Sequence, residues 1–216
     1  LLDRGIQPGD RIGLFANNCP EWSQIDFGAA TVRAVPVPIY ATSTPQQIRH
    51  IAADSGMRIL FVGGRSEGER VLEVAGDLPA LELVVILTPW EGMSAQIVAY
   101  DDFRATPDAA ALEERLAGAS PADLTSIIYT SGTTGDPKGV MLRHSAIIAQ
   151  KEALEKLFHF GPEEHSLCFL PLSHALERAW TSVVLLKGCM NTYVPDARTV
   201  AEALVQAKPT LLVSVP

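Results

Sequence analysis

The stretch LTSIIYTSGTTGDPKGVML, residues 124–142, contains the transition that decides the fold. Its first part, residues 124–130, is rich in β-branched and aromatic side chains and predicts a strand. Residues 131–137 consist only of Ser, Gly, Thr, Asp and Pro, which predicts a loop. Residues 138–142 predict a short strand that returns from the loop. A polar, glycine-rich loop therefore follows directly on an apolar strand.

The chemistry of this loop suits a polyphosphate. Glycines let backbone N–H groups approach an anion closely, hydroxyl groups add donors, and a lysine adds a positive charge. The residues that supply these groups are Ser131, Gly132, Thr133, Thr134, Gly135 and Lys138. Their spacing is that of neither a Walker A loop nor a GxGxxG fingerprint. A surface turn without a ligand is the alternative, and the strand before the loop and the stiff Pro137 near its end favour phosphate binding over it.

The rest of the chain alternates between apolar strand-like runs and helices, which predicts an α/β fold with a mainly parallel sheet and flanking helices. Residues 35–41 contain two prolines, so we expect an edge strand or an extended crossing rather than a central strand. Helices are predicted to begin after Asn18 and Thr44, each with a proline in its first turn, and the second to end at Ser55–Gly56. Further strands are predicted over residues 10–16, 58–64, 82–87, 190–194 and 210–215, and residues 166–173 predict a strand that ends in a loop. Further helices are predicted over residues 68–76, 144–158 and 199–207, with Ile147, Ile148, Leu154 and Leu157 of the second facing inward.

Two other segments shape the expected organisation. The pattern weakens over residues 88–123, where we place a boundary between two lobes of one domain. The clearest helix has an inward stripe and a polar face. The stripe is Ala175, Leu176, Ala179, Trp180, Val183 and Val184, and the residues expected to face away are Glu177, Arg178, Thr181 and Ser182.

Composition limits the class of protein. The 216 residues are 47% hydrophobic and 19% charged, which is a globular composition, and the formal net charge is −8. An acidic chain without a basic run is not expected to bind nucleic acid. Cys19, Cys168 and Cys189 match no metal-binding spacing and suggest reduced thiols, hence a cytoplasmic protein. No apolar run reaches the length of a membrane helix, and no signal peptide is apparent.

The two ends of the chain suggest a piece of a longer protein. The chain begins with LLDRGIQPGD rather than methionine, and it ends directly after the apolar run LLVSV. Strand edges and apolar faces left without their usual cover favour association between copies. We therefore expect the isolated chain to self-associate.

Residues 129–144, YTSGTTGDPKGVMLRH, resemble the signature loop of the adenylate-forming (AMP-binding) superfamily, which includes acyl-CoA synthetases, luciferases and the adenylation domains of peptide synthetases. Other stretches resemble the long-chain fatty acyl-CoA synthetases in particular: GDRIGLFANNCPEW, VPVPIYATSTPQQIRHIAADSG, LPLSHALER and KPTLLVSVP. The resemblance covers residues 1–216 and implies part of the large N-terminal AMP-binding domain of the acyl-CoA synthetase-like fold, without the C-terminal domain.

The resemblance implies an activity with ATP, Mg²⁺ and coenzyme A. A fatty carboxylate would attack the α-phosphate of ATP and release pyrophosphate, and the thiol of CoA would then displace AMP from the acyl-adenylate. Within the family's loop, the segment from Thr130 to Gly135 cradles the β- and γ-phosphates, Lys138 is the mobile cation and Thr130 helps to hold magnesium. The family's later motifs are not in this chain, so we expect it to be inactive alone.

His174 is the second site residue that the resemblance indicates, because the family's LPLxH histidine lies near the acyl carboxylate and the α-phosphate. Capping of the following helix is an alternative that is compatible with this role. Glu177 and Arg178 match the long-chain subgroup's ER pair or form a solvated helix pair. Trp180 is expected in the core rather than in an acyl tunnel. We expect His50, His159 and His165 on the surface.

Two alternatives for function remain. Within enzymes, the acid could be an aryl or medium-chain acid instead of a long-chain one. Outside enzymes, the chain could be a stand-alone nucleotide-binding pseudoenzyme. Because the substrate is a lipid, a peripheral contact of the whole protein with the inner membrane face is also open, although no basic amphipathic helix indicates it.

Overall fold

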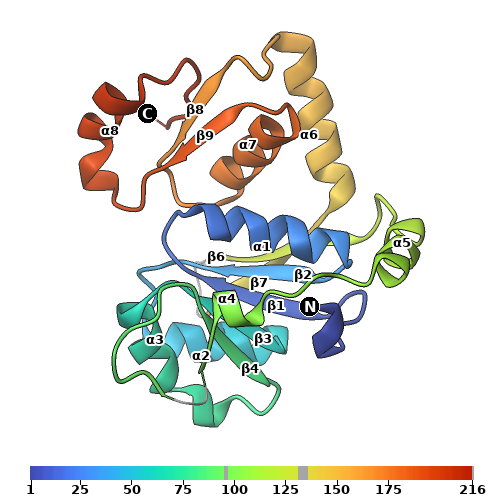
Figure 1. Cartoon of the computed structure of the whole chain (residues 1–216), viewed down its shortest axis with the longest axis vertical. Helices are drawn as coiled ribbons and strands as arrows, with labels where there is room; N and C mark the ends of the chain where they lie inside the picture. Colours follow the sequence, from blue (N-terminus) through green and yellow to red (C-terminus); the bar gives the residue numbers. More distant parts are fainter. Residues whose placement is uncertain (95–96, 131–135, 216) are drawn as a thin grey trace.

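The computed structural model describes residues 1–94, 97–130 and 136–215. Its largest element is a five-stranded sheet in the order β2-β1-β3-β4-β5, and every neighbouring pair is parallel (Figure 1). The strands are β1 (Arg11–Phe15), β2 (Val35–Ile39), β3 (Ile59–Val62), β4 (Leu83–Ile86) and β5 (Ile97–Ala99). The predicted parallel α/β sheet is thereby confirmed. β5 was missed by the sequence analysis, since only three residues form it.

Helices cover both faces of this sheet (Figure 1). Leu14 of β1 packs with Trp22 and Ile25 on one face, whereas its neighbour Phe15 packs with Ile48 on the other, because successive strand residues point to opposite faces. The helices are α1 (Pro20–Thr31) on the first face, α2 (Pro45–Ser55) and α3 (Arg65–Leu72) on the second, and α4 (Tyr100–Phe103) and α5 (Ala109–Ala117) farther along the chain. Short 3₁₀ turns are η1 (Leu2–Arg4), η2 (Ala75–Asp77) and η3 (Ala197–Thr199).

The two predicted proline-started helices have different caps. Thr44 caps α2 through a capping box with Gln47, and Gly56 ends the helix in the left-handed conformation at φ 60°, as the sequence predicts. α1 begins after Cys19, whose side chain makes no capping hydrogen bond. The expectation that Asn18 caps α1 is wrong. Asn18 instead binds a segment far away in the sequence.

Pro36 and Pro38 end the five-stranded sheet at β2. The N–H of Val35 donates to Asp10 on the β1 side, so the backbone of residues 36 and 38 faces the outer edge. Proline has no N–H, and this edge therefore cannot donate to a further strand. The expected edge position is confirmed. Even so, all five residues of β2 are buried, because β6 lies against this side.

The strand and the returning strand of the loop segment form a separate antiparallel pair, β6 (Leu124–Thr130) and β7 (Lys138–Arg143). The pair lies beside β2 (Figure 1). The Ser126 hydroxyl, fully buried, donates to the Pro36 carbonyl at 2.9 Å. The Ser126 side chain, and not a paired strand, thus supplies the hydrogen bond to the Pro36 carbonyl at the outer edge of β2.

The last part of the chain forms a third sheet of two parallel strands, β8 (His165–Cys168) and β9 (Met190–Tyr193). Its helices are α6 (His144–Leu157), α7 (Ala175–Leu186) and α8 (Val200–Ala207). The strand expected over residues 210–215 is wrong, since only a single bridge joins Leu211 to Ser166. The inward face expected for α6 is wrong too: none of its residues is buried, and Leu157 is largely exposed.

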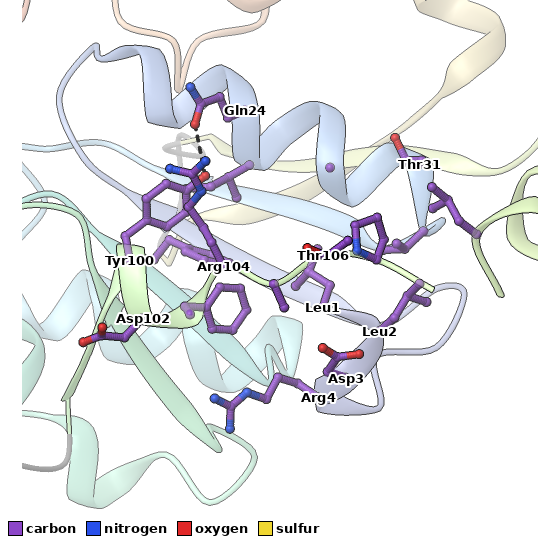
Figure 2. Close-up of a pocket in the computed structure, with 18 residues that line it drawn as sticks. Leu1, Leu2, Asp3, Arg4, Gln24, Thr31, Tyr100, Asp102, Arg104 and Thr106 are labelled. Carbon is purple, nitrogen blue, oxygen red and sulfur yellow. Dashed lines mark hydrogen bonds between the residues drawn. The ribbon is translucent and has the colours of Figure 1, made fainter. Parts of the chain in front are cut away.

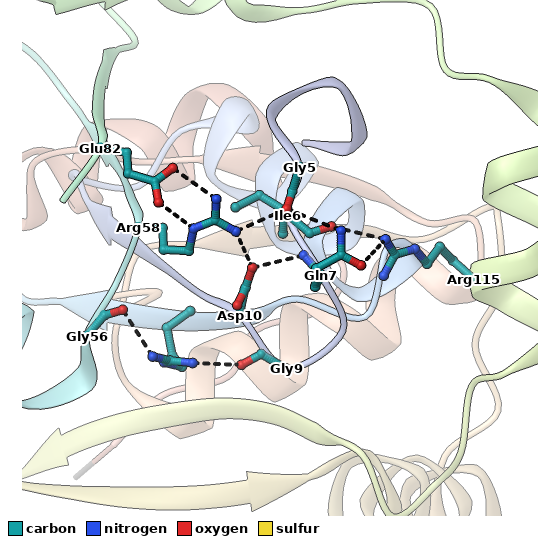
Figure 3. A network of polar contacts seen from close by, with 10 residues as sticks. Gly5, Ile6, Gln7, Gly9, Asp10, Gly56, Arg58, Glu82 and Arg115 are labelled. Atoms are coloured by element: carbon teal, nitrogen blue, oxygen red, sulfur yellow. Dashed lines mark hydrogen bonds and ion pairs between the residues drawn. The ribbon is translucent and has the colours of Figure 1, made fainter. Parts of the chain in front are cut away.

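The amino ends of the large sheet are tied together by charges. Arg58, just before β3, bonds to the carboxylates of Asp10 and Glu82, which precede β1 and β4 (Figure 3). Arg11 donates to the carbonyls of Ser55 and Gly56 at 2.6 and 3.1 Å. At the opposite, carboxyl edge, Asn18 follows β1 and bonds to the backbone of Cys168, Leu170 and Leu172. Parallel sheets usually present their binding sites at this edge.

A buried ion pair joins α7 to α1. The Arg178 guanidinium donates to both Asp26 carboxylate oxygens, Nε at 2.9 Å and Nη2 at 2.6 Å, and to the Thr125 carbonyl at 2.9 Å. The side chains of Arg178 and Asp26 are only 8% and 13% exposed. The expectation of a solvated Glu177/Arg178 pair on an outward face is therefore wrong. The outward face of α7 is buried because α1 and β6 lie against it.

Replacing Arg178 tests the importance of this contact. Arg178→Met leaves the buried Asp26 carboxylate unpaired, and we expect the free energy of unfolding to fall by about 3–5 kcal/mol. Arg198→Met is the control, because Arg198 is 90% exposed and pairs with Asp196 at the surface. Urea unfolding measures both. Equal, small effects would show that the α1–α7 pair contributes little.

Candidate functional site

The base of the predicted phosphate loop is a closed hairpin. Thr130 ends β6, Lys138 begins β7, and the two are cross-strand partners in the antiparallel register. Partners of this kind project to the same face of a ladder. Both residues are exposed, so a hydroxyl and an ammonium group are available side by side. Ser131, Gly132, Thr133, Thr134 and Gly135 lie outside the described residues, and their roles stay predictions.

Helix α2 anchors both ends of this hairpin. The Tyr129 hydroxyl donates to Asp54 Oδ2 at 2.5 Å, and His50 Nε2 lies 2.8 Å from the Pro137 carbonyl oxygen. A carbonyl oxygen only accepts, so Nε2 of His50 carries the proton. His50, which we expected on the surface, is half-buried and bonds to Pro137. His50 and Asp54 are four residues apart on one helix face, a spacing that could have suggested a shared partner.

Tyr129, which is buried, and Gly139 are cross-strand partners in the hairpin. Burial, and then the Asp54 carboxylate, raise the pKa of Tyr129 well above its usual range, so its hydroxyl stays a donor. A Cβ on Gly139 would lie 2.7 Å from Ile127 Cγ2 and 3.1 Å from the Tyr129 ring. Glycine is therefore required at this position for the aromatic ring to lie across the strand.

His174 caps α7. The Nδ1 atom of its ring accepts the Leu176 N–H at 3.2 Å, and its backbone N–H donates to the Pro171 carbonyl at 2.8 Å. The capping alternative is thus confirmed. Because Nδ1 accepts, the neutral ring carries its proton on Nε2, and the exposed ring can donate that proton to an acceptor outside. Within the described residues, no hydrogen bond or ion pair joins His174 to Thr130 or Lys138.

Asn18, which the sequence analysis treated as a helix cap, holds the segment before His174. Its Nδ2 donates to the carbonyls of Cys168 and Leu170 at 3.3 and 2.8 Å, and its Oδ1 accepts the Leu172 N–H at 3.0 Å. The side chain is buried, so these bonds replace water entirely. No local pattern could have revealed partners that lie 150 residues away.

Glu177 is fully buried in the first turn of α7. Its Oε2 accepts the Leu170 N–H at 3.1 Å, and its Oε1 accepts the Thr181 hydroxyl at 3.3 Å. Burial raises the pKa of Glu177 to about 7, although the bonds from Cys168, Leu170 and Thr181 partly offset it. Trp180, nearby, donates its indole N–H to Ser166 at 2.9 Å and contacts the Phe160 ring, which agrees with a packing role.

A cavity of about 480 Å³ lies away from these residues, between η1, α1 and residues 100–107 (Figure 2). Its lining includes Phe61, Tyr100 and Phe103, and it includes none of Thr130, Lys138 and His174. Tyr100 donates to Gln24 at 3.3 Å across one end. The cavity therefore does not coincide with the predicted phosphate site.

The described residues contain no group of three or more His, Cys, Asp or Glu side chains that could hold a metal ion. Thr130 supplies one exposed hydroxyl. Over the same described ranges, no helix has the length and apolar character needed to cross a membrane.

The buried carboxyl group of Glu177 predicts a pH-dependent stability. The unfolded chain loses this proton near pH 4.5 and the folded chain near pH 7. Wild type therefore loses stability as pH rises through this window, by roughly 3 kcal/mol at most. Glu177→Gln should escape the loss, so its advantage over wild type should be larger at pH 8 than at pH 5 in urea unfolding. A difference independent of pH would contradict the assignment.

Comparison with known proteins agrees with this geometry. The AMP-binding enzyme family matches residues 1–216. The long-chain-fatty-acid–CoA ligase FadD15 of Mycobacterium bovis is 35% identical over 219 residues, which cover 100% of this chain and 36% of that protein. The chain thus spans about a third of the length of such relatives.

Solved structures show the same fold. A long-chain-fatty-acid–CoA ligase, FadD1 from Archaeoglobus fulgidus, matches with a TM-score of 0.76 at 23% identity, over 100% of this chain and 41% of that one. The anthranilate CoA ligase AuaEII, in complex with anthranoyl-AMP, matches with a TM-score of 0.78 at 22% identity, over 98% and 41%. Together with the match over residues 1–216, these findings establish that the chain belongs to the AMP-binding enzyme family.

Proposed function

We propose that the protein activates a long-chain fatty acid with ATP to an acyl-adenylate and then transfers the acyl group to coenzyme A. Membership of the AMP-binding enzyme family supports the use of ATP. The long-chain substrate is supported by the names of relatives that align with the whole chain at 28–35% identity. We infer a cytoplasmic protein because its thiols are free and ATP and CoA are its co-substrates.

The observation that carries the proposal is the pairing of Thr130 with Lys138. A loop whose two ends are cross-strand partners is closed at its base. Thr130 and the segment 131–135 would hold the β- and γ-phosphates through N–H and O–H groups. Lys138 would offset the negative charge that grows on the departing pyrophosphate. The anchors to Asp54 and His50 would keep this base rigid.

His174 would serve the other reactant. Its cap on α7 directs the proton of the neutral ring to Nε2, which can donate to a carboxylate or phosphate oxygen. The amino end of α7 lies at the same place and also favours an anion. The fatty carboxylate oxygen would then attack the α-phosphorus as the bond to pyrophosphate breaks. In the second step the CoA sulfur bonds to the acyl carbon and AMP leaves.

Magnesium enters the proposal only with ATP. Mg²⁺ prefers an octahedral set that usually includes one or two carboxylates and substrate phosphates. The described residues offer the Thr130 hydroxyl and no carboxylate cluster. Thr130 would be one ligand, which does not make a site by itself, and we assign no step of the reaction to the ion.

Titration of Mg-ATP into the 216-residue chain tests the phosphate site. Binding at about 100 times the dissociation constant adds roughly 2.7 kcal/mol, which corresponds to a rise in melting temperature of about 5–10 °C. Lys138→Ala should shrink this rise, and Lys156→Ala, which removes an exposed lysine of α6, should not. No rise in wild type would refute ATP binding by this chain, and an equal rise in both variants would refute the role of Lys138.

The acid is tested by turnover. In the protein that contains this chain, a long-chain fatty acid should yield acyl-CoA, AMP and pyrophosphate, whereas the 216-residue chain alone should show no pyrophosphate exchange. Faster activation of an aryl or medium-chain acid would replace the proposed substrate, and binding of ATP without any turnover would indicate a pseudoenzyme.

Self-association of the chain is a separate proposal. Leu157, Met190 and Val205 are each more than 60% exposed, and apolar surface of this kind favours contacts between copies. Light scattering should give a mass above that of the monomer and rising with concentration. A constant monomer mass would contradict the proposal.

A further inference from the structure

We propose that Asn18 and Glu177 are positioning residues that fix the segment before His174, residues 169–173, and through it the orientation of the His174 ring. The inference rests on the proposed function, because it assigns His174 a place beside the reacting groups. It concerns two side chains that would touch neither ATP nor the fatty acid.

The segment needs such partners because it has no regular secondary structure. Residues 169–173 lie between the end of β8 and the start of α7, outside any helix or strand. Buried backbone groups in such a segment must find side chains or water. Leu172 and Ser173 are buried, so side-chain partners are required here.

Leu170 is held from both sides. Its carbonyl accepts from Asn18 Nδ2 at 2.8 Å, and its N–H donates to Glu177 Oε2 at 3.1 Å. Asn18 also takes the Leu172 N–H at 3.0 Å. Asn18 lies in the connection after β1 and Glu177 lies in α7, so side chains from two separate parts of the fold bind Leu170.

These contacts also position the ring of His174. The backbone N–H of His174 donates to the carbonyl of Pro171. Pro171 lies between Leu170 and Leu172, the two residues that Asn18 and Glu177 bind. The ring then caps α7 through Nδ1, and Nε2 remains the free nitrogen. A shift of residues 170–172 would move the backbone of His174 relative to α7 and break the cap. Misplacement of a reacting group by about 1 Å can lower a rate by about 10²-fold.

Glu177 is a costly choice for packing alone. An ionisable side chain without exposure is penalised in its charged form, and burial raises the pKa of its carboxyl group to about 7. An apolar side chain would avoid this penalty, but it would leave the Leu170 N–H without an acceptor. Such penalties are typical of functional positions.

A double-mutant cycle in the whole ligase tests the inference. Adenylate formation is followed by single turnover with wild type, Asn18→Ala, His174→Ala and the double variant. We expect Asn18→Ala to lower the adenylation rate by about 10²-fold, with the KM for ATP within about twofold of wild type. If Asn18 acts through His174, then adding Asn18→Ala to His174→Ala should change the rate little further. Multiplying losses would overturn the proposal.

Further variants separate positioning from stability. Glu177→Gln keeps an oxygen for the Leu170 N–H and should retain the adenylation rate, whereas Glu177→Leu should lose it. Asn17→Ala, next to Asn18 but exposed, is the matched control and should behave as wild type. If Asn18→Ala does not fold, Asn18→Asp replaces it, because it loses both donors and keeps the acceptor. Full activity of Asn18→Asp and Glu177→Leu would refute the inference. An inactive wild type would refute the proposed function instead.

Discussion

Two prolines, which have no backbone N–H, determine where the large sheet ends. Pro36 and Pro38 place no donors on the outer edge of β2, so the large parallel sheet ends there. The next strand in space, β6, runs beside this edge as part of its own antiparallel pair and satisfies the edge through Ser126. β6 pairs with β7 from Leu124 to Thr130. A hairpin with a closed base, rather than another strand of the large sheet, results.

The second half of the molecule is built onto this arrangement through α1. One face of α1 packs on the sheet through Trp22 and Ile25, and Asp26 on the same helix binds Arg178 of α7. Arg178 also reaches the backbone of β6 at Thr125. The Arg178 guanidinium therefore links α7 to the hairpin and, through α1, to the large sheet. The relative placement of Lys138 and His174 depends on these contacts.

Local patterns were sufficient for most of the fold. Thr44, Pro45 and Gly56 predicted the bounds of α2, and the prolines of β2 predicted an edge. They failed where the decisive partner is remote. Asn18 resembled a helix cap, His50 a surface histidine and Glu177 a solvated glutamate, yet each binds backbone or side chains outside its own element or turn. Hydrophobic spacing shows which face of a helix is apolar, but not that α1 covers the polar face of α7.

The contact between Asn18 and Leu170 also has a consequence for the folding of the chain. Asn18 and Leu170 are separated by 152 positions. Closing so long a loop has an entropic cost that is met before the contact forms, and non-local contacts of this kind slow folding. During synthesis the connection after β1 emerges long before its partner, so the Asn18 amide bonds to water until Leu170 is available. The contacts that fix the segment beside His174 therefore cannot form until both parts of the chain have been synthesised.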